Sequence, residues 1–254
     1  MKARIFCHCI TSFFLLVACC TTRQTVQQTM PLECPEITEE DHVIAHKAYY
    51  ASFNTITLTP NWVAYVLTAN HTDGPYSRKG RYFVPDPDCS CQQPDNNDYR
   101  ESGFARGHLI PAGDVKWDST AMHESFYFTN CMPQDIQFNN SKWNQLEEKT
   151  RRLAHKYDSV YVVCGPIYDQ LDTICIGDNQ VAVPDKCFKA LLIHNGESYS
   201  AIGFIMNNGG EDRTVMDCAC TIDALESVIK RDLFFNLPDK IEDAVESKVI
   251  WTDW

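Results

Sequence analysis

The order of strand-like and helix-like segments along this chain of 254 residues limits its fold more than any other sequence feature. Short apolar runs that predict β-strands occupy residues 62–67, 160–163, 189–193 and 200–205. Apolar patterns with helical spacing occupy residues 140–156, 221–232 and 239–247. A doubly wound sheet would need strands and helices in strict alternation, which this order lacks. We therefore predict an α+β fold.

The chain is apolar enough to form a core and is acidic overall. Its 44% of apolar residues argues against a disordered chain, and its length suits one large domain or two small ones. Lys and Arg number 22 against 34 Asp and Glu, which gives a formal net charge of −12. Proteins that coat nucleic acids are basic, so this class is disfavoured. A polyanionic substrate would need a local basic site or a bound cation.

The first 18 residues are predicted to be a signal peptide outside the fold. Lys2 and Arg4 precede the apolar stretch 13–18, which is too short for an ordinary transmembrane helix and fits a secretory signal. The stretch ends at Cys19 in a pattern that resembles a bacterial lipoprotein signal, in which this cysteine carries the lipid. A plain secretion signal cleaved nearby is the alternative. We expect an extracytoplasmic protein, lipid-anchored to a bacterial membrane and facing the periplasm or the cell surface.

The rest of the chain divides into a tether and one domain. The polar run 21–29 lacks hydrophobic periodicity, so residues 19–40 are predicted to form a flexible tether. No repeat or low-complexity block follows. Residues 41–254 are therefore predicted to form a single domain.

Cysteine usage agrees with export. Three of the 13 cysteines, Cys7, Cys9 and Cys19, are assigned to the signal and the lipid, which leaves ten. An even number in an exported protein favours disulfides, although the sequence does not fix their pairing. Zinc held by the two C-x-C pairs is the alternative, but zinc ligands usually stand two to four residues apart.

The residues with the clearest chemistry lie between positions 104 and 151. His108 stands beside Arg106, several asparagines follow, and Glu147 lies on a predicted helix. Hydrolysis of a phosphodiester needs a base for the attacking water and positive charge for the phosphoryl and leaving oxygens. His108 can be the base, and Arg106 offers a rigid fork of donors. Mg²⁺ prefers oxygen ligands and keeps several waters, so one Asn carbonyl can suffice as its protein ligand.

Each of these residues also has an ordinary structural interpretation. An Arg-Gly-His tripeptide is often a turn with a hydrogen-bonded histidine. Asn139 and Asn140, before a helix, are often caps, and Trp143 fits a core position. Glu147 and Arg151, four residues apart in the favourable order, would form an exposed helix pair.

Longer motifs resemble a known family, the DNA/RNA non-specific endonucleases, which are ββα-metal (His-Me finger) nucleases and include endonuclease G. The family signature Asp-Arg-Gly-His stands here as residues 105–108, with Ala105 in place of Asp. The pattern Ser-Asn-x-x-Pro-Gln stands as residues 129–134, and Asn-x-x-x-Trp-x-x-Leu-Glu as residues 139–147. Weaker similarity extends over residues 43–247 in family order. The resemblance implies a central, mainly antiparallel sheet flanked by helices.

The resemblance also implies roles for individual residues. His108 matches the general base, Asn139 the single direct metal ligand and Glu147 the acid that holds metal-bound water. Four further positions match residues near the phosphate or the base: Arg81, Arg106, Asn130 and Arg151. By resemblance His108 ends the second strand of the ββα unit and Asn139 begins its helix. The positive end of that helix would weaken cation binding, which Glu147 and the phosphate would offset.

The implied activity is Mg²⁺-dependent cleavage of DNA and RNA, with Mn²⁺ as an alternative ion. It would be sugar- and sequence-non-specific and would leave 5′-phosphates. Ala105 replaces a carboxylate that helps to order the family's active site, so activity is expected to survive, with altered metal affinity or altered basicity of His108. Two alternatives stay open: a catalytically impaired nucleic-acid-binding lipoprotein on the same fold, and a disulfide-rich structural lipoprotein.

Overall fold

The computed structural model of the chain describes residues 30–169, 173–210 and 212–249. The predicted signal peptide, residues 1–18, and the lipid site at Cys19 lie outside the described residues. Within those ranges, no helix is long and apolar enough to cross a membrane.

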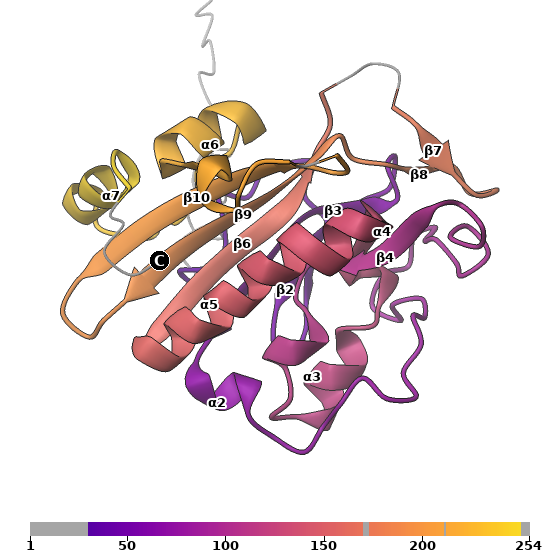
Figure 1. Cartoon of the computed structure of the whole chain (residues 1–254), viewed down its shortest axis with the longest axis horizontal. Coiled ribbons are helices and arrows are strands. Elements are labelled where there is room, and N and C mark those ends of the chain that lie inside the picture. Colours follow the sequence, from indigo (N-terminus) through magenta and orange to yellow (C-terminus); the bar gives the residue numbers. More distant parts are fainter. Residues whose placement is uncertain (1–29, 170–172, 211, 250–254) are drawn as a thin grey trace, which may run out of the picture. The chain divides into compact units, whose positions relative to one another are not determined.

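A seven-stranded antiparallel sheet forms the centre of the domain (Figure 1). Its order is β1-β2-β3-β6-β9-β10-β11, and every neighbouring pair is antiparallel. The strands are β1 (Val43–Ala45), β2 (Tyr50–Asn54), β3 (Thr59–Leu67), β6 (Ser159–Ile167), β9 (Lys186–His194), β10 (Tyr199–Asn207) and β11 (Ala219–Cys220). The four predicted apolar runs fall in β3, β6, β9 and β10, the strands that are buried on both faces.

Helices cover both faces of this sheet. Helix α5 (Asn144–Lys156) lies along β6, and the side chain of Lys189 on β9 points toward Trp143, just before α5. The next residue, Ala190, points to the opposite face, because strand side chains alternate. There it pairs with Gly203, where a side chain would meet Leu225 of helix α6 (Ile222–Ile229). Helix α7 (Asp239–Glu246) packs beside α6 against β10.

Two small hairpins and several short helices complete the described fold. The hairpins are β4 (Phe104–His108) with β5 (Cys131–Asp135), and β7 (Cys175–Ile176) with β8 (Val181–Ala182). The short helices include α2 (Ala69–Thr72) and α3 (Ser119–Glu124). The predicted α+β class, with a mainly antiparallel sheet flanked by helices, is confirmed.

The predicted tether, residues 19–40, is wrong in its described part. The compact unit begins at Pro31, not at residue 41. Cys34 is fully buried, and the Glu36 backbone N–H donates to the Asp232 carbonyl at 2.8 Å. Glu33 and Pro35 are buried beside Cys34, and these three adjacent residues form no periodic apolar pattern to detect.

Of the disulfides that the cysteine count favours, one pair is present among the described residues. One disulfide joins Cys89 to Cys91, which removes this C-x-C pair as a zinc site. Cys34, Cys131, Cys164 and Cys187 are buried thiols instead. Burial raises the pKa of Cys131 and of Cys187 to about 12, so these thiols stay protonated and pack as small apolar groups.

Candidate active site

The ββα unit is built from the β4–β5 hairpin and the helical run that follows β5. His108 is the last residue of β4, opposite Cys131 on β5. It therefore ends the first strand of the unit, and the expectation that it ends the second is wrong. The reason is chain order, since only β5 leads directly into the helix.

The helical run that carries Asn139 starts earlier than the sequence suggested. It begins with α4 (Ile136–Phe138), capped by the Asp135 side chain, which accepts the Phe138 N–H at 2.8 Å. A π-helical turn, Asn139–Trp143, follows and leads into α5. Asn139 is thus inside the helix and does not cap it. Widened turns of this kind often occur at functional sites.

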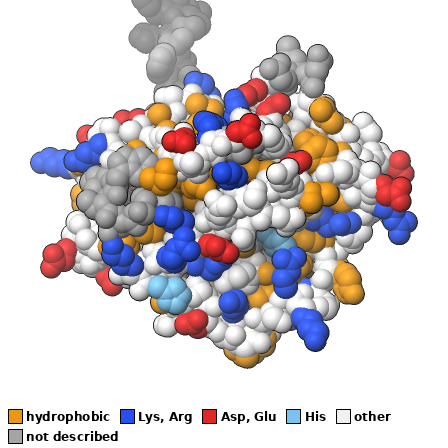
Figure 2. Space-filling model, in the orientation of Figure 1, with side chains coloured by type: hydrophobic (Ala, Val, Ile, Leu, Met, Phe, Trp, Pro, Cys, Tyr) orange, Lys and Arg blue, Asp and Glu red, His pale blue; other side chains and the backbone are white. Residues whose placement is uncertain are grey.

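One cavity of about 430 Å³ gathers most of the predicted site residues. It is lined by Arg78, Arg106, His108, Pro111, Ala112, Gly113, Asn139, Asn140, Asn144, Glu147 and Arg151. On the face that carries α5, Lys and Arg side chains gather although the chain is acidic as a whole (Figure 2). The local basic site that an acidic protein needs for a polyanion is therefore present.

His108 faces this cavity as a neutral imidazole. Its ring packs against Phe83 and Phe126, with centroids 4.6 and 4.8 Å away. Burial, and secondarily Arg78, lowers the pKa of His108 to about 3. Its Nε2 atom is buried without a hydrogen-bond partner. The ring is therefore unprotonated at neutral pH, and a bound phosphodiester anion would raise its basicity.

Glu147 is the buried carboxyl group of the cavity. Only 9% of its surface is exposed, and burial raises its pKa to about 7, while nearby Lys189 opposes this rise. Lys189 is itself fully buried, with Nζ 4.7 Å from the centre of the Trp143 ring and no hydrogen-bond partner. A carboxyl group whose pKa lies near neutrality can exchange its proton for a metal cation.

The arginines of the cavity are held by groups that the sequence did not connect to them. Arg106 Nη2 donates to the Asn96 carbonyl at 2.7 Å, and its guanidinium carbon lies 5.1 Å from the centre of the Tyr99 ring. Arg151 Nη1 donates to Asp114 Oδ1 at 2.9 Å. Asp114 is thus the ion-pair partner of Arg151, and the interpretation of Glu147 and Arg151 as an exposed pair is wrong.

Arg81 and Asn130 do not line the cavity. Arg78 lines it in place of Arg81, whose backbone N–H donates to the Arg78 carbonyl within a turn. Asn130 is fully buried and brackets Ile110: its Oδ1 accepts the Ile110 N–H at 2.9 Å, and its Nδ2 donates to the Ile110 carbonyl at 3.0 Å. It therefore fixes the backbone just after His108, which fits support of the base and not contact with substrate.

Ala105, where the family has Asp, also lies outside the cavity lining. Arg106 and His108 are two residues apart on β4 and both face the cavity. Ala105 precedes Arg106, so its side chain points to the other face of the strand. The substitution therefore leaves the cavity's own groups in place.

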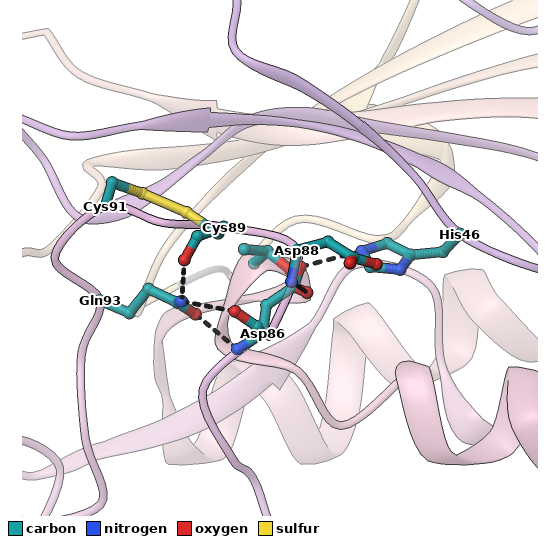
Figure 3. The surroundings of a disulfide bond; sticks show 7 residues. His46, Asp86, Asp88, Cys89, Cys91 and Gln93 are labelled. Atoms are coloured by element: carbon teal, nitrogen blue, oxygen red, sulfur yellow. Dashed lines mark hydrogen bonds and ion pairs between the residues drawn. A yellow bond between two sulfur atoms is a disulfide. The ribbon is translucent and has the colours of Figure 1, made fainter.

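The loop of residues 83–98 supports both Arg106 and His108. Phe83 packs on His108, the Asn96 carbonyl holds Arg106, and Asn96 Nδ2 donates to the Phe83 carbonyl at 2.8 Å. Gln93 closes the middle of the loop by accepting the Asp86 N–H at 2.7 Å, beside the disulfide (Figure 3).

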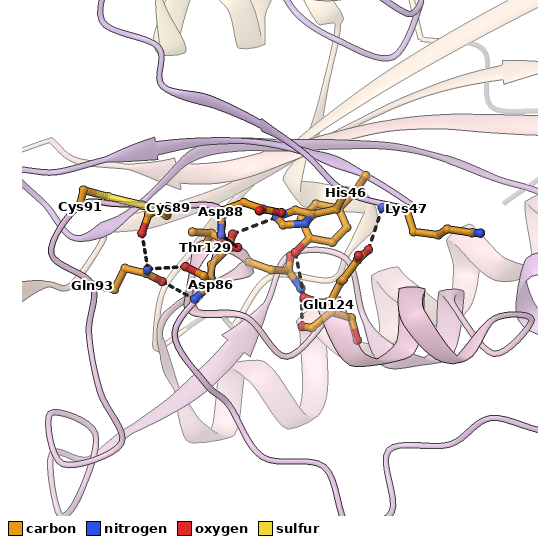
Figure 4. A network of polar contacts seen from close by, with 12 residues as sticks. His46, Lys47, Asp86, Asp88, Cys89, Cys91, Gln93, Glu124 and Thr129 are labelled. Carbon is orange, nitrogen blue, oxygen red and sulfur yellow. Dashed lines mark hydrogen bonds and ion pairs between the residues drawn. A yellow bond between two sulfur atoms is a disulfide. The ribbon is translucent and has the colours of Figure 1, made fainter.

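The same loop is anchored to the rest of the domain through Asp86. His46 Nε2 lies 2.9 Å from Asp86 Oδ2, and Thr129 donates to the same oxygen (Figure 4). Phe83, the residue of this loop that packs on His108, is thus held in place by a polar network outside the cavity.

The donor set of the cavity fits a hard divalent cation. Asn139 supplies an amide oxygen, and Glu147 supplies a carboxylate that lacks an ion-pair partner among the described residues. A cation with one direct amide ligand would keep most of its waters, as Mg²⁺ does. The amide and the carboxylate would hold the ion and its water.

The comparisons with known proteins agree with this geometry. The family model described as DNA/RNA non-specific endonuclease matches residues 33–241. Mitochondrial nuclease EXOG of Danio rerio is 37% identical over 161 residues, which cover 59% of this chain and 47% of the relative. Mitochondrial endonuclease G of Caenorhabditis elegans is 33% identical over 218 residues, covering 78% of this chain and 70% of the relative.

A solved structure gives the same result. The crystal structure of the EndoG/EndoGI complex contains a chain that matches with a TM-score of 0.76 and 29% identity, over 85% of this chain and 94% of that chain. The matched region spans about half the length of the EXOG nucleases. The family match nevertheless covers most of this chain, which therefore belongs to the DNA/RNA non-specific endonuclease family.

Proposed function

We propose that this protein is a Mg²⁺-dependent endonuclease that hydrolyses DNA and RNA. The observation that carries the proposal is the meeting of His108, Asn139 and Glu147 in one cavity with three arginines. The unpartnered Nε2 of His108 accepts the proton of the attacking water. Arg78, Arg106 and Arg151 bind the phosphoryl oxygens.

The cation would be held by Asn139, with Glu147 orienting a water bound to it. When bound, Mg²⁺ would neutralise charge on the phosphoryl oxygens and on the leaving 3′ oxygen. Because the bond between phosphorus and the 3′ oxygen is the one that breaks, the products would carry a 5′-phosphate. The groups that line the cavity suit a phosphate backbone, which is common to both sugars and to all sequences. This supports sugar- and sequence-independent cleavage, with Mn²⁺ as an alternative ion.

The test is cleavage of plasmid DNA and of RNA by the full-length protein with Mg²⁺ or with EDTA. We expect cleavage with Mg²⁺ only, and a loss of about 10³-fold in His108→Ala, since general-base catalysis supplies roughly 10²–10⁴-fold. Asp243→Asn, an exposed change on α7, is the matched control and keeps full activity. Cleavage that survives both EDTA and His108→Ala would reject the proposal.

A non-catalytic nucleic-acid-binding protein is the competing function. This alternative rests on the replacement of the family's Asp by Ala105. Ala105 lies outside the cavity, so the replacement leaves the cavity's own groups in place. The non-catalytic alternative predicts gel shifts without cleavage in the assay above.

We further propose that the protein is anchored to a bacterial membrane by a lipid on Cys19. The support is the apolar stretch 13–18 directly before this cysteine. Mass spectrometry of the native N-terminus tests this: a lipid-modified Cys19 is expected, and an unmodified N-terminus elsewhere contradicts the anchor.

A further inference from the structure

Helices α6 and α7 bring three carboxyl groups together, away from the nuclease cavity. Asp223 and Glu226 lie three residues apart on α6 and so share a face, and Glu246 is the last residue of α7. One carboxylate oxygen from each lies within 4.8 Å of the other two. Asp223 is exposed and Glu246 is buried, so the cluster opens to solvent on one side.

Among the described residues, no ion pair balances the negative charge of this cluster. Glu246 is only 5% exposed, and its Oε1 atom is buried without a hydrogen-bond partner. After burial, the groups that raise its pKa to about 9 are all carboxylates: Glu226, Glu242, Asp232 and Asp223. Glu246 also stands at the negative end of its helix, where a cation is favoured and an anion is not.

Hydrogen bonds among the described residues satisfy few of the carboxylate oxygens in this cluster. Glu226 Oε1 accepts the Leu233 N–H at 2.7 Å, but no hydrogen bond satisfies Glu246 Oε1. A buried carboxyl group keeps its negative charge only beside a paired charge or a metal ion, and otherwise takes up a proton. The unpartnered oxygen beside two further carboxylates therefore indicates that a ligand of positive charge belongs there.

We propose that Asp223, Glu226 and Glu246 form a Ca²⁺ site. Ca²⁺ binds carboxylate oxygens at about 2.3–2.6 Å, so two of its ligands stand at most about 5 Å apart, in agreement with the spacing of this cluster. Three carboxylates in a protein cage suit Ca²⁺ better than Mg²⁺, which keeps its own waters and binds through one or two carboxylates.

The expected role of the ion is structural. Helix α7 packs against β10 and α6, and the ion would tie its last residue to two residues of α6. Helix α6 covers the face of the sheet opposite α5, so the site is separate from the nuclease cavity. Ca²⁺ binding should therefore raise stability without being needed for cleavage.

The test is thermal unfolding of the full-length protein in EDTA and in about 1 mM Ca²⁺, a concentration that covers the weak range of protein Ca²⁺ sites. All variants are made on an Asn139→Ala background, which removes the ligand in the nuclease cavity. We expect Ca²⁺ to raise the midpoint by roughly 5 °C. Calorimetric titration should show one bound ion.

Glu246→Gln keeps the shape of the side chain and removes the ligand charge. We expect it to fold, to unfold in EDTA at the same temperature as its parent or higher, and to lose the Ca²⁺ shift. Asp243→Asn removes the same charge from an exposed position on α7 and should keep the shift.

Two results would overturn the site. One is a Ca²⁺ shift of equal size in Glu246→Gln. The other is no shift in the parent, with stability that falls as the pH rises from 5 to 8 whether or not Ca²⁺ is present, since the carboxyl groups would then share protons only. Neither result bears on nuclease activity.

Discussion

The nuclease cavity beside α5 and the carboxylate cluster between α6 and α7 both bury ionisable groups, but they balance charge differently. In and beside the cavity, Glu147 and Asp114 lie near protein cations, chiefly Lys189 and Arg151. In the cluster, the charged groups that act most strongly on Glu246 are carboxylates. A site that supplies its own positive charge can bind and release a metal ion during turnover, whereas a site without it depends on the ion.

Among the charged groups that distinguish the two regions, the largest effect on cleavage is expected at Glu147, whose pKa lies close to neutrality. Glu147→Gln should lower cleavage at pH 8 by about 100-fold, within the range of acid–base contributions. In the proposed mechanism the ionised form of Glu147 is the active one, so cleavage by the native protein should rise with pH through about 7. His108, with a pKa of about 3, is already unprotonated over this range.

In the proposed mechanism Mg²⁺ competes with the proton on Glu147, which gives a second measurement. Raising Mg²⁺ tenfold should move the midpoint of the pH–rate profile down by up to about one unit. A Glu147→Gln profile with the same midpoint as the native protein would assign the titration to another group.

Removal of Arg151 should leave a buried carboxylate without a paired cation, as in the carboxylate cluster. Asp114 is fully buried and pairs with Arg151, so Arg151→Met should lower the free energy of unfolding by about 3 kcal/mol. Urea unfolding measures this loss. The double variant Arg151→Met/Asp114→Asn should recover most of it, because Tyr65 can still donate to residue 114. A double variant as unstable as the single one would show that the charge of Asp114 is not the cause.

A smaller loss of kcat/KM should distinguish the role of Arg78 from that of Arg81. Arg78 lines the cavity and Arg81 does not, so Arg78→Ala should lower kcat/KM about tenfold, which corresponds to about 1.4 kcal/mol for one charged contact. Arg81→Ala should change kcat/KM less than about twofold, a change smaller than one such contact gives. Steady-state cleavage of a labelled oligonucleotide measures both. Equal losses would mean that the loop rearranges when substrate binds.

The smallest effect is expected from a charge added outside both regions. Ala105→Asp restores the family residue on the face of β4 that points away from the cavity, opposite Gln134 of β5, so kcat/KM and the Mg²⁺ requirement should each change less than about threefold, below one charged contact. A larger gain in Mg²⁺ affinity would show that this face of the strand influences the ion.

The apolar strands were predictable because each carries its own signal. Strands β3, β6, β9 and β10 are buried on both faces, so a short run of apolar residues is enough to identify them. The hairpin strand β4, with residues such as Arg106 and His108 and partly exposed positions, has no such run and was located only by its motif. The packing of residues 31–40 left no periodic pattern at all.

The sequence by itself determined the α+β class, and its motifs determined the family, with His108, Asn139 and Glu147 at the positions that line the cavity. Tertiary structure alone decided that Arg78 and not Arg81 faces the cavity, that Asp114 pairs with Arg151, and that Glu246 meets Asp223 and Glu226. The reason is physical: a periodic or motif signal is local in the chain, whereas an ion pair between positions 114 and 151 depends on how distant segments pack.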